Sequence, residues 1–343
     1  MNEKTLYVGI DVAKDKFDVA FTIDGSQIFE HSTITNDKKG FSQLLKKAIK
    51  IQKKTEALHI HFCMEATGIY HCNLCESLQE HSDLIVSVVN PIRTKSFSKS
   101  LMLRTKNDKV DSSMLALYAF FHKPPKTPKT PEIIKEFRAL VRYQESLVES
   151  RTQEIARLKS SLNSEVQKLI QKKILFVEKQ IKQVIFKIQQ LIKSDEFLTK
   201  QMNLLKTVDG IGDKVAWKLL SEIKFETIDN ISPKAQVAQA GLSPKEHSSG
   251  SSIKARPHIS RMGNSDMRKV LFLPALGCIK NPNHFTPFYL RLLDNGKPKK
   301  LAVVAVMRKM LLTAAGVLKN QEPFDPNWAH KTQENYMNSL KVA

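Results

Sequence analysis

The amino-acid sequence predicts an α/β domain at the N-terminus, then long helices and a mainly helical C-terminal region. Three patterns support this order. Short apolar blocks that alternate or run continuously extend as far as Val89. No Pro or Gly occurs between Glu132 and Asp209, and Gly, Pro and Ser return after Thr207. With 343 residues, the chain is long enough for two domains.

The N-terminal blocks predict a hairpin, a third strand and then strands that alternate with helices. A turn signal at Asp24-Gly25 closes the hairpin, and Asn90-Pro91 ends the last strand. We expect strands at residues 5–12, 17–23, 28–35, 58–64 and 84–89, and helices at 41–51 and 69–78. This order of elements predicts a mixed α/β sheet.

After Asp108, apolar residues recur at helical spacing and predict a helix that ends before the Pro-rich stretch HKPPKTPKTP. Beyond that boundary, apolar residues lie three and four apart, as in a coiled-coil seam: Ile155, Leu158, Leu162, Val177, Ile181, Val184, Ile188 and Leu191. Either a helical hairpin or a coiled coil between subunits would bury this stripe, and we favour oligomerisation.

The net charge of +20, from 54 Lys and Arg against 34 Asp and Glu, favours nucleic acid as the partner, because cationic surfaces attract phosphate backbones. A cationic surface that serves only solubility is the alternative. No stretch reaches the roughly 18 apolar residues of a membrane span, so we expect a cytosolic protein. Cys72 and Cys75 lack a second ligand pair nearby, which argues against a zinc site.

Four carboxylates occupy positions that suit a metal site. Asp11 ends the first strand, Glu65 follows a later strand, and Asp108 and Asp111 lie three apart at the start of a helix, on one face. Mg²⁺ prefers carboxylate oxygens, and two-metal phosphoryl transfer needs several of them together. Taken singly, each acid has an ordinary explanation: Asp108 as a helix cap, and Asp15 or Asp18 as hairpin surface residues.

Two further segments point to nucleic acid. The segment LLKTVDGIGDKVAWKLL resembles a helix-hairpin-helix, in which Gly210 and Gly212 let backbone N–H groups, with Lys214 beside them, approach a phosphate. A tight interhelical turn is the alternative. Downstream, serines surround Gly250 among basic residues: Lys254, Arg256, Arg261 and Arg268. A serine hydroxyl there is a candidate nucleophile, and a flexible Ser-Gly loop is the alternative.

Six ordered blocks together resemble one family over nearly the whole chain. They are GIDVAKDKFDVA, MEATGIYH, NPIRTKSFSKSLMLRTKNDKVDSSMLALYA, DGIGDKVA, AGLSPKEHSSGSS and ISRMGNSDMRKVL. The sequence resembles the DEDD-type insertion-sequence transposases related to the Piv DNA invertase, which are bridge-RNA-guided serine recombinases.

The resemblance implies an RNase H-like or RuvC-like domain at 1–125, a helical coiled-coil linker at 126–203, a C-terminal transposase domain at 204–320 and a polar tail at 321–343. It also implies Mg²⁺, donor and target DNA, a structured noncoding RNA that pairs with both, and a homo-oligomer from dimer to tetramer in which the acids of one subunit complement the serine of another.

The tetrad of the family matches Asp11, Glu65, Asp108 and Asp111. Ser249, directly before Gly250, best matches the nucleophile, with Ser248 as the alternative one place earlier. These residues predict Mg²⁺-dependent strand exchange through a phosphoserine intermediate. Two rival functions are a RuvC-like metal-dependent junction nuclease, in which the serine loop only binds, and a nonenzymatic nucleic-acid-binding protein.

Overall fold

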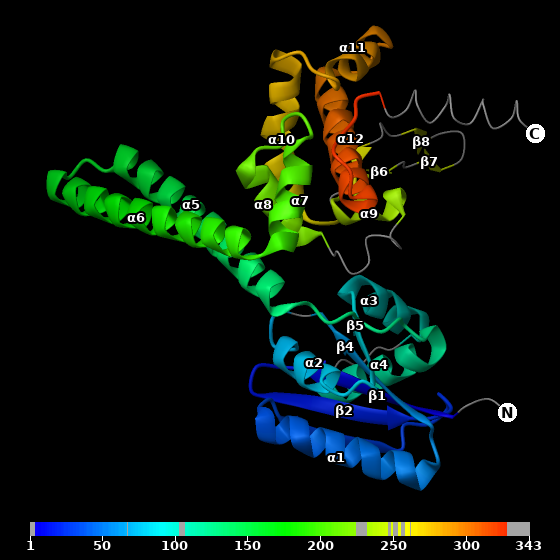
Figure 1. Cartoon of the computed structure of the whole chain (residues 1–343). Helices are drawn as coiled ribbons and strands as arrows, with labels where there is room; N and C mark the ends of the chain where they lie inside the picture. Colours follow the sequence, from blue (N-terminus) through cyan, green and yellow to red (C-terminus); the bar gives the residue numbers. More distant parts are fainter. Residues whose placement is uncertain are drawn as a thin grey trace, which may run out of the picture. The chain divides into compact units, whose positions relative to one another are not determined.

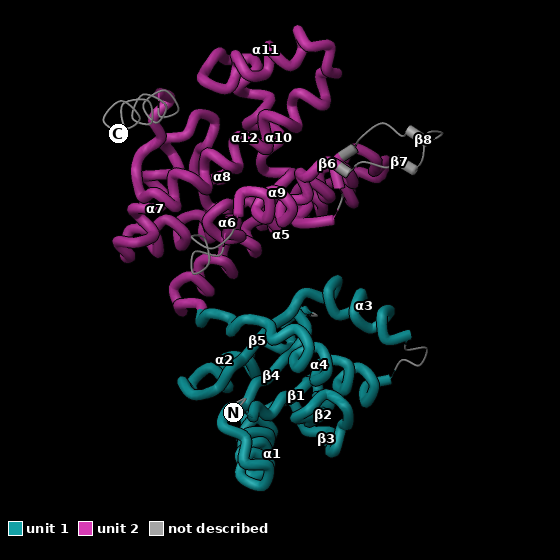
Figure 2. The backbone as a smooth tube through the Cα atoms, turned by 90° about the vertical axis from the view of Figure 1, so that its right-hand side faces the viewer, with its two compact units in different colours: residues 1–129 teal, residues 130–343 magenta. Residues whose placement is uncertain are grey.

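The computed structural model describes residues 4–66, 68–102, 107–223, 232–245, 248–249, 253–254, 258–260 and 262–327. The chain forms two compact units that meet between Lys129 and Thr130 (Figure 2). We call them the N-terminal unit and the C-terminal unit.

A five-stranded mixed sheet forms the centre of the N-terminal unit (Figure 1). Its strands are β1 (Thr5–Val12), β2 (Lys16–Thr22), β3 (Glu30–Thr35), β4 (His59–Glu65) and β5 (Ile85–Val89), in the spatial order β3-β2-β1-β4-β5. The first three strands pair antiparallel, whereas β4 runs parallel to β1 and to β5. The predicted α/β class is confirmed, and this order fits the RuvC-like domain that the resemblance implies.

Alternation of side chains along the strands divides the unit into two cores. Leu6, Val8 and Ile10 of β1 pack with helices α1 (Lys38–Thr55) and α2 (Cys72–Gln79) on one face of the sheet. Tyr7 of β1 and Cys63 of β4 face α4 (Asp108–His122) on the other. Since successive residues point to opposite faces, every second residue of β1 lies under α4.

One helix of this unit was not predicted. Helix α3 (Pro91–Ser100) begins directly after β5, where the sequence had indicated only the end of a strand. The Asn90 side chain accepts a hydrogen bond from the backbone N–H of Ile92 at 2.8 Å, and Pro91 occupies the first helical position. Both features can signal the end of a strand or the start of a helix, and here they mark the end of β5 and the start of α3.

Helices α5 (Glu132–Ser160) and α6 (Ser164–Ser194) of the C-terminal unit pack along each other as a hairpin closed by residues 161–163 (Figure 1). The predicted stripe is buried on α6, at Val177, Ile181, Val184 and Ile188. The prediction is wrong for the end of α5, because Ile155 is 36% exposed and Leu162 is fully exposed.

Glu154 is buried in place of these apolar residues, with Arg157 Nη1 at 2.7 Å and Lys173 Nζ at 2.6 Å from its carboxylate. The register of the hairpin therefore turns a charged position inward, and two cations compensate the buried carboxylate.

The rest of the C-terminal unit is a helical bundle with two small antiparallel ribbons. Its helices are α7 (Glu196–Lys206), α8 (Asp213–Glu222), α9 (Pro233–Gln239), α10 (Ser265–Lys280), α11 (Thr286–Asp294) and α12 (Lys299–Asn320). The ribbons pair β6 (Pro244–Lys245) with β9 (His258–Ile259), and β7 (Ser248–Ser249) with β8 (Ile253–Lys254).

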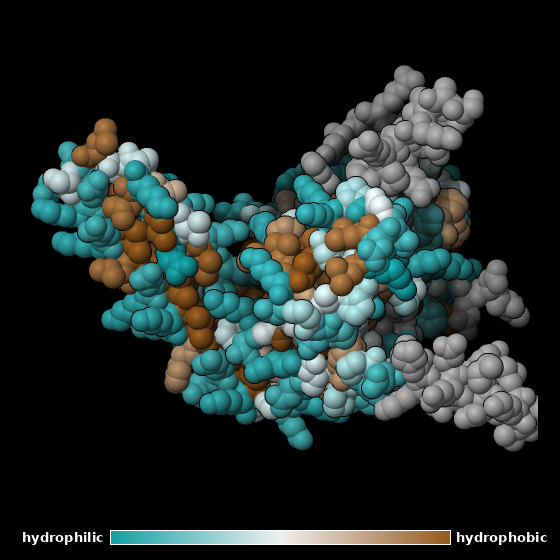
Figure 3. All heavy atoms as spheres, turned by 90° about the horizontal axis from the view of Figure 1, so that it is seen from above, coloured by the Kyte–Doolittle hydropathy of each residue, from teal (hydrophilic) through white to brown (hydrophobic). Residues whose placement is uncertain are grey.

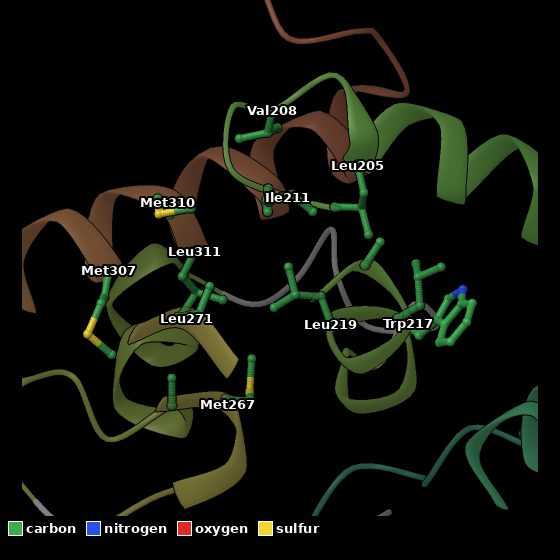
Figure 4. Close-up of a cluster of buried hydrophobic side chains, with 14 of the residues drawn as sticks. Leu205, Val208, Ile211, Trp217, Leu219, Met267, Leu271, Met307, Met310 and Leu311 are labelled. Carbon is green, nitrogen blue, oxygen red and sulfur yellow. The ribbon is translucent and has the colours of Figure 1, made fainter. Parts of the chain in front are cut away.

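Helix α12 runs through the core of this bundle, and Figure 4 shows Met307 and Leu311 on the side of α12 that faces Met267 and Leu271 of α10. The expectation that no segment is apolar enough for a membrane span is wrong for α12, whose best 18-residue window has a mean hydropathy of 1.9. More than half of that window is buried inside the unit. Its apolar character is therefore accounted for by its place in the core.

Lys218 of α8 is a buried cation that joins three helices. Its Nζ lies 2.7 Å from Glu145 of α5, 3.2 Å from Glu222 of α8 and 3.9 Å from Asp266 of α10. A buried charge is tolerated only when it is paired, so these contacts restrict the angle at which the α5/α6 hairpin leaves the bundle.

We predict that Gly9→Ala destabilises the N-terminal unit by about 2 to 3 kcal/mol, as overpacking does. A Cβ at Gly9 would lie 2.1 Å from Ala116 N and 2.2 Å from Ser112 O, both backbone atoms of α4. Hydrogen–deuterium exchange of β1 peptides during urea denaturation measures the loss. As the control, Gly316→Ala in α12 meets nothing within 4 Å and should stabilise its helix by about 1 kcal/mol. Equal effects of the two substitutions would show that the α4 contact is not tight.

Candidate active site

The sheet brings three acidic residues to one edge and one face. Asp11 lies opposite Asp18 in the antiparallel pairing of β1 with β2, so their side chains share a face. Ile10 lies opposite Met64 in the parallel pairing of β1 with β4, so Asp11 and Glu65 follow at the same edge. This is the face that α4 covers.

Helix α4 adds two more carboxylates from above. It crosses β1 at Gly9, where the missing side chain lets the helix backbone touch the strand. Its first turn carries Asp108 and Asp111, which the crossing places over the end of β1. The Asn107 side chain accepts a hydrogen bond from the backbone N–H of Val110 at 2.9 Å and caps the helix. The interpretation of Asp108 as the helix cap is therefore wrong.

Burial and repulsion by the neighbouring acids raise the pKa of Asp11. Its pKa is raised from 3.8 to about 6, first by burial and then by repulsion from Asp111, Asp108, Glu65 and Asp18. Repulsion between like charges falls with distance, so the acids that the sheet register and α4 set near Asp11 are the ones that act on it. The backbone places the four acids that the sequence singled out on one face, at the end of β1.

Asp18 is a fifth acid of this group, and its interpretation as a hairpin surface residue is wrong. It is 6% exposed and accepts a hydrogen bond from the Thr33 hydroxyl. Asp15, in contrast, is exposed in the turn. The signal for Asp18 was present in the sequence, since a short hairpin places it across from Asp11, but the register was needed to use it.

Two neighbours of these acids, one a cation and one a neutral hydroxyl, were not predicted from the sequence. Lys16 Nζ lies 2.9 Å from Asp108 Oδ2 and 3.6 Å from Asp18 Oδ2. Its ammonium group lowers the pKa of Asp108, chiefly through this hydrogen bond. The buried Thr94 of α3 donates to Glu65 Oε2 at 2.6 Å. Neither residue belongs to a recognisable spacing pattern, because each reaches the acids through the tertiary fold.

The acid cluster suits a divalent cation in its chemistry. Carboxylate oxygens are the ligands that Mg²⁺ prefers, and a group of acids that repel one another gains from a bound cation. Within the described residues, no three Asp, Glu, His or Cys side chains stand close enough to hold one ion as they lie. The acids share one edge of the sheet without forming a complete ligand set for one ion.

The segment that resembles a helix-hairpin-helix forms a short turn between α7 and α8. Gly210 has φ +81°, and a Cβ there would lie 2.9 Å from Cys278 Sγ, so conformation and packing both require this glycine. Gly212 caps α8 and has open space around it, and Lys214 is exposed one residue into the helix. The start of α8 is thus the part of the turn that a phosphate could approach.

The serine segment lies in the C-terminal unit. The backbones of Ser248 and Ser249 form β7, opposite Lys254 and Ile253 of β8. Arg256 and Arg261 lie outside the described residues. Arg268 Nη1 donates to the carbonyl oxygen of Ala240 at 3.0 Å and lies near those of Gly263 and Asn264, at 3.4 and 3.3 Å, so its guanidinium helps to hold the turn before α10.

Comparison with solved structures adds little to this picture. RuvC from T. thermophilus, solved in complex with a Holliday junction substrate, is similar at 11% identity with a TM-score of 0.27. The match covers 34% of this chain and 94% of that one. At this score, the strand order described above remains the stronger observation on the fold.

Sequence comparison is decisive. Residues 8–166 match the profile of a transposase family of DEDD and IS110 type, and residues 202–290 match the Transposase IS116/IS110/IS902 family. The pilin gene-inverting proteins of Moraxella bovis and Moraxella lacunata are each 34% identical over 329 residues, which is 93% of this chain and 97% of theirs. The chain therefore belongs to the IS110 family of DEDD transposases and is an enzyme of DNA recombination.

Proposed function

We propose that this transposase joins donor and target DNA by Mg²⁺-dependent strand exchange, and that Asp11, Glu65, Asp108 and Asp111 are its metal-binding residues. The observation that carries the proposal is the backbone arrangement: the β1/β4 register and the crossing of α4 at Gly9 bring the four acids to one face at the end of β1. The DEDD family also implies a divalent metal. Bound Mg²⁺ would supply Lewis-acid stabilisation of the charge that develops on a reacting phosphate.

The residues around the tetrad have separate roles in this proposal. Asp11 and Glu65 are fixed by adjacent parallel strands, so their spacing is set by the sheet. Asp108 and Asp111 come from the first turn of α4, whose position depends on the Gly9 contact. Lys16 offsets part of the negative charge and is placed to meet a DNA phosphate at the same edge.

We further propose Ser249 as the nucleophile, with Ser248 as the alternative. Its hydroxyl oxygen would attack a DNA phosphorus, lose its proton and form a phosphoserine ester, while the bond to the leaving strand breaks and that strand's oxygen takes up a proton. A hydroxyl of the second strand would then attack the ester, and serine would leave with a proton. Support comes from the Ser-Gly cluster among Lys254, Arg256 and Arg261, because neighbouring cations would stabilise the charge that develops on the phosphate.

The proposed partners are donor and target DNA and a structured noncoding RNA that pairs with both. Gly210, Gly212, Lys214, Lys254, Arg256, Arg261 and Arg268 are the proposed nucleic-acid-binding residues. We keep 1–125 as the catalytic domain, 126–203 as the linker and 204–320 as the transposase domain, all acting in the bacterial cytosol. The support for nucleic acid is the net charge of +20 together with the family.

Oligomerisation is proposed through the α5/α6 hairpin. Figure 3 shows brown apolar atoms along it, and its outer half exposes five large apolar residues: Leu162, Val166, Leu169, Leu175 and Phe176. Exposed apolar side chains on neighbouring turns of one helix are typical of a protein interface. A dimer or tetramer would let the acids of one subunit meet the serine of another.

The catalytic proposal predicts different effects for two substitutions. With co-purified RNA and DNA that carries the element ends, Asp111→Asn should slow strand cleavage on the order of 10³-fold, because a charged ligand is lost. Ser249→Ala should abolish the SDS-resistant protein–DNA adduct, measured with end-labelled DNA, and Ser248→Ala should retain it. If Ser249→Ala cleaves at the full rate without an adduct, a metal-dependent nuclease is the correct function.

The raised pKa of Asp11 predicts a pH-dependent gain from Asp11→Asn. Ionising Asp11 costs folding free energy, because the folded protein binds the proton more tightly than the unfolded chain does. This cost is absent below about pH 4 and complete above about pH 6. Asp11→Asn should therefore stabilise β1 at pH 7.5 by roughly 1 to 2 kcal/mol, allowing for solvent screening.

The gain should vanish near pH 4. Urea denaturation in EDTA at pH 7.5 and at pH 4, followed by hydrogen exchange of β1 and β4 peptides, measures the gain at each pH. A gain of the same size at the two pH values would mean that the charge of Asp11 is not its cause.

The oligomerisation proposal predicts that Leu169→Lys together with Phe176→Lys shifts the protein towards monomer. The two charges would have to be buried at an apolar interface. Light scattering after size-exclusion chromatography measures the mass. Leu58→Lys, which changes a residue 62% exposed in the N-terminal unit, is the matched control and should leave the mass unchanged. An unaltered mass in the double variant would place the interface elsewhere.

A further inference from the structure

We propose that Thr94 is a positioning residue of the active site, which orients the Glu65 carboxylate for metal binding. This inference rests on the metal-dependent function proposed above. Thr94 lies in α3, the helix that the sequence did not predict, and it does not belong to the acidic tetrad. Its action would be through Glu65 rather than by contact with DNA or metal.

The fold holds Thr94 in one place. Strand β5 pairs in parallel with β4, with Val89 opposite Glu65, and α3 starts two residues after Val89. The Asn90 cap and Pro91 fix the first turn of that helix. The side chain of Thr94 projects from this rigid turn and is completely buried. Its position relative to β4 is therefore set by backbone structure on both sides.

The hydrogen bond itself is short and has a charged acceptor. Thr94 Oγ1 lies 2.6 Å from Glu65 Oε2 and 2.9 Å from the carbonyl oxygen of Pro91. A hydroxyl has one proton, and an ionised carboxylate competes for it better than a neutral carbonyl does. When Glu65 is ionised, as metal binding requires, the proton lies towards Glu65.

Glu65 needs such support more than the aspartates do. A glutamate side chain has one more rotatable bond than an aspartate, so more conformational entropy is lost when it binds a cation. A buried hydrogen bond that restricts the carboxylate beforehand reduces this loss. Removing such an outer hydrogen bond commonly weakens metal binding by about 10- to 100-fold.

The chain offers a matched comparison at the same site. Thr33 of β3 donates to Asp18 as Thr94 donates to Glu65. Asp18 is near the tetrad but is not one of its four matched acids. A general disturbance of the acid cluster would affect both threonines, whereas a specific role in orienting a metal ligand affects Thr94 alone.

Calorimetric titration of the full-length protein with Mn²⁺ alone tests the proposal. Thr94→Val, which keeps the shape and removes the hydroxyl, should weaken Mn²⁺ binding by about 10-fold or more. Thr94→Ser restores the hydroxyl and should lie within about threefold of the wild type. Thr33→Val should leave the affinity unchanged. Hydrogen exchange of β4 and α3 peptides without metal verifies that each variant is folded.

Two outcomes would overturn the positioning role: wild-type affinity in Thr94→Val, or equal losses in Thr94→Val and Thr33→Val. If Thr94→Val fails to fold, Thr94→Ser and Thr94→Cys decide between the alternatives, since only a hydroxyl donor should preserve tight binding. Mn²⁺ binding by the wild type separates this inference from the proposed function. A wild type that binds no Mn²⁺ refutes the metal site, whereas tight binding in the wild type and in Thr94→Val refutes only the role of Thr94.

Discussion

The contact between the backbone of α4 and Gly9 of β1 is the constraint on which the active site depends. Any side chain at Gly9 would collide with Ala116 N and Ser112 O, so the helix and strand touch directly. This contact brings the first turn of α4, with Asp108 and Asp111, over the strand that ends in Asp11. The sheet register adds Glu65 and Asp18 on the same face. Five acids from four elements thus lie near one another because one glycine lets two of these elements approach closely.

A protein with a net charge of +20 concentrates negative charge at this one edge. This concentration of negative charge disfavours the ionised form of Asp11, whose pKa rises to about 6 through burial and the repulsion of its neighbours. Lys16 contacts Asp108 and Asp18, Thr33 donates to Asp18 and Thr94 donates to Glu65, so the carboxylates are stabilised without added negative charge. The arrangement favours a cation at the acids while the rest of the surface remains attractive to phosphate backbones. In the proposed mechanism, a metal ion at the acids and a DNA phosphate beside them would meet where these two opposite preferences adjoin.

The C-terminal unit also buries charges, one cation and one anion, and pairs each with groups of the opposite sign. Lys218 is 2% exposed and is compensated by Glu145, Glu222 and Asp266 from three helices. Glu154 is compensated by Arg157 and Lys173 within the hairpin. Paired charges of this kind contribute little net stability but allow few alternative packings, because each other arrangement leaves an ion unpaired. Such pairing would serve the proposed oligomer, in which the hairpin presents its apolar outer half to another subunit.

The sequence alone determined the α/β class, the strands and the family, because alternation and helical spacing are local patterns and ordered blocks mark the family. The same blocks pointed to the tetrad, whose role stays a prediction. The sequence did not determine α3, since Asn90-Pro91 marks a strand end and a helix start equally well. It placed Ile155 in the hairpin seam where the structure buries Glu154, because spacing gives a period but no partner register. The roles of Asp18, Lys16 and Thr94 appeared only in three dimensions, because each depends on a cross-strand register or on the crossing of a helix over the sheet. Local periodicity fixes which face a side chain takes, and only tertiary packing decides which side chain it meets.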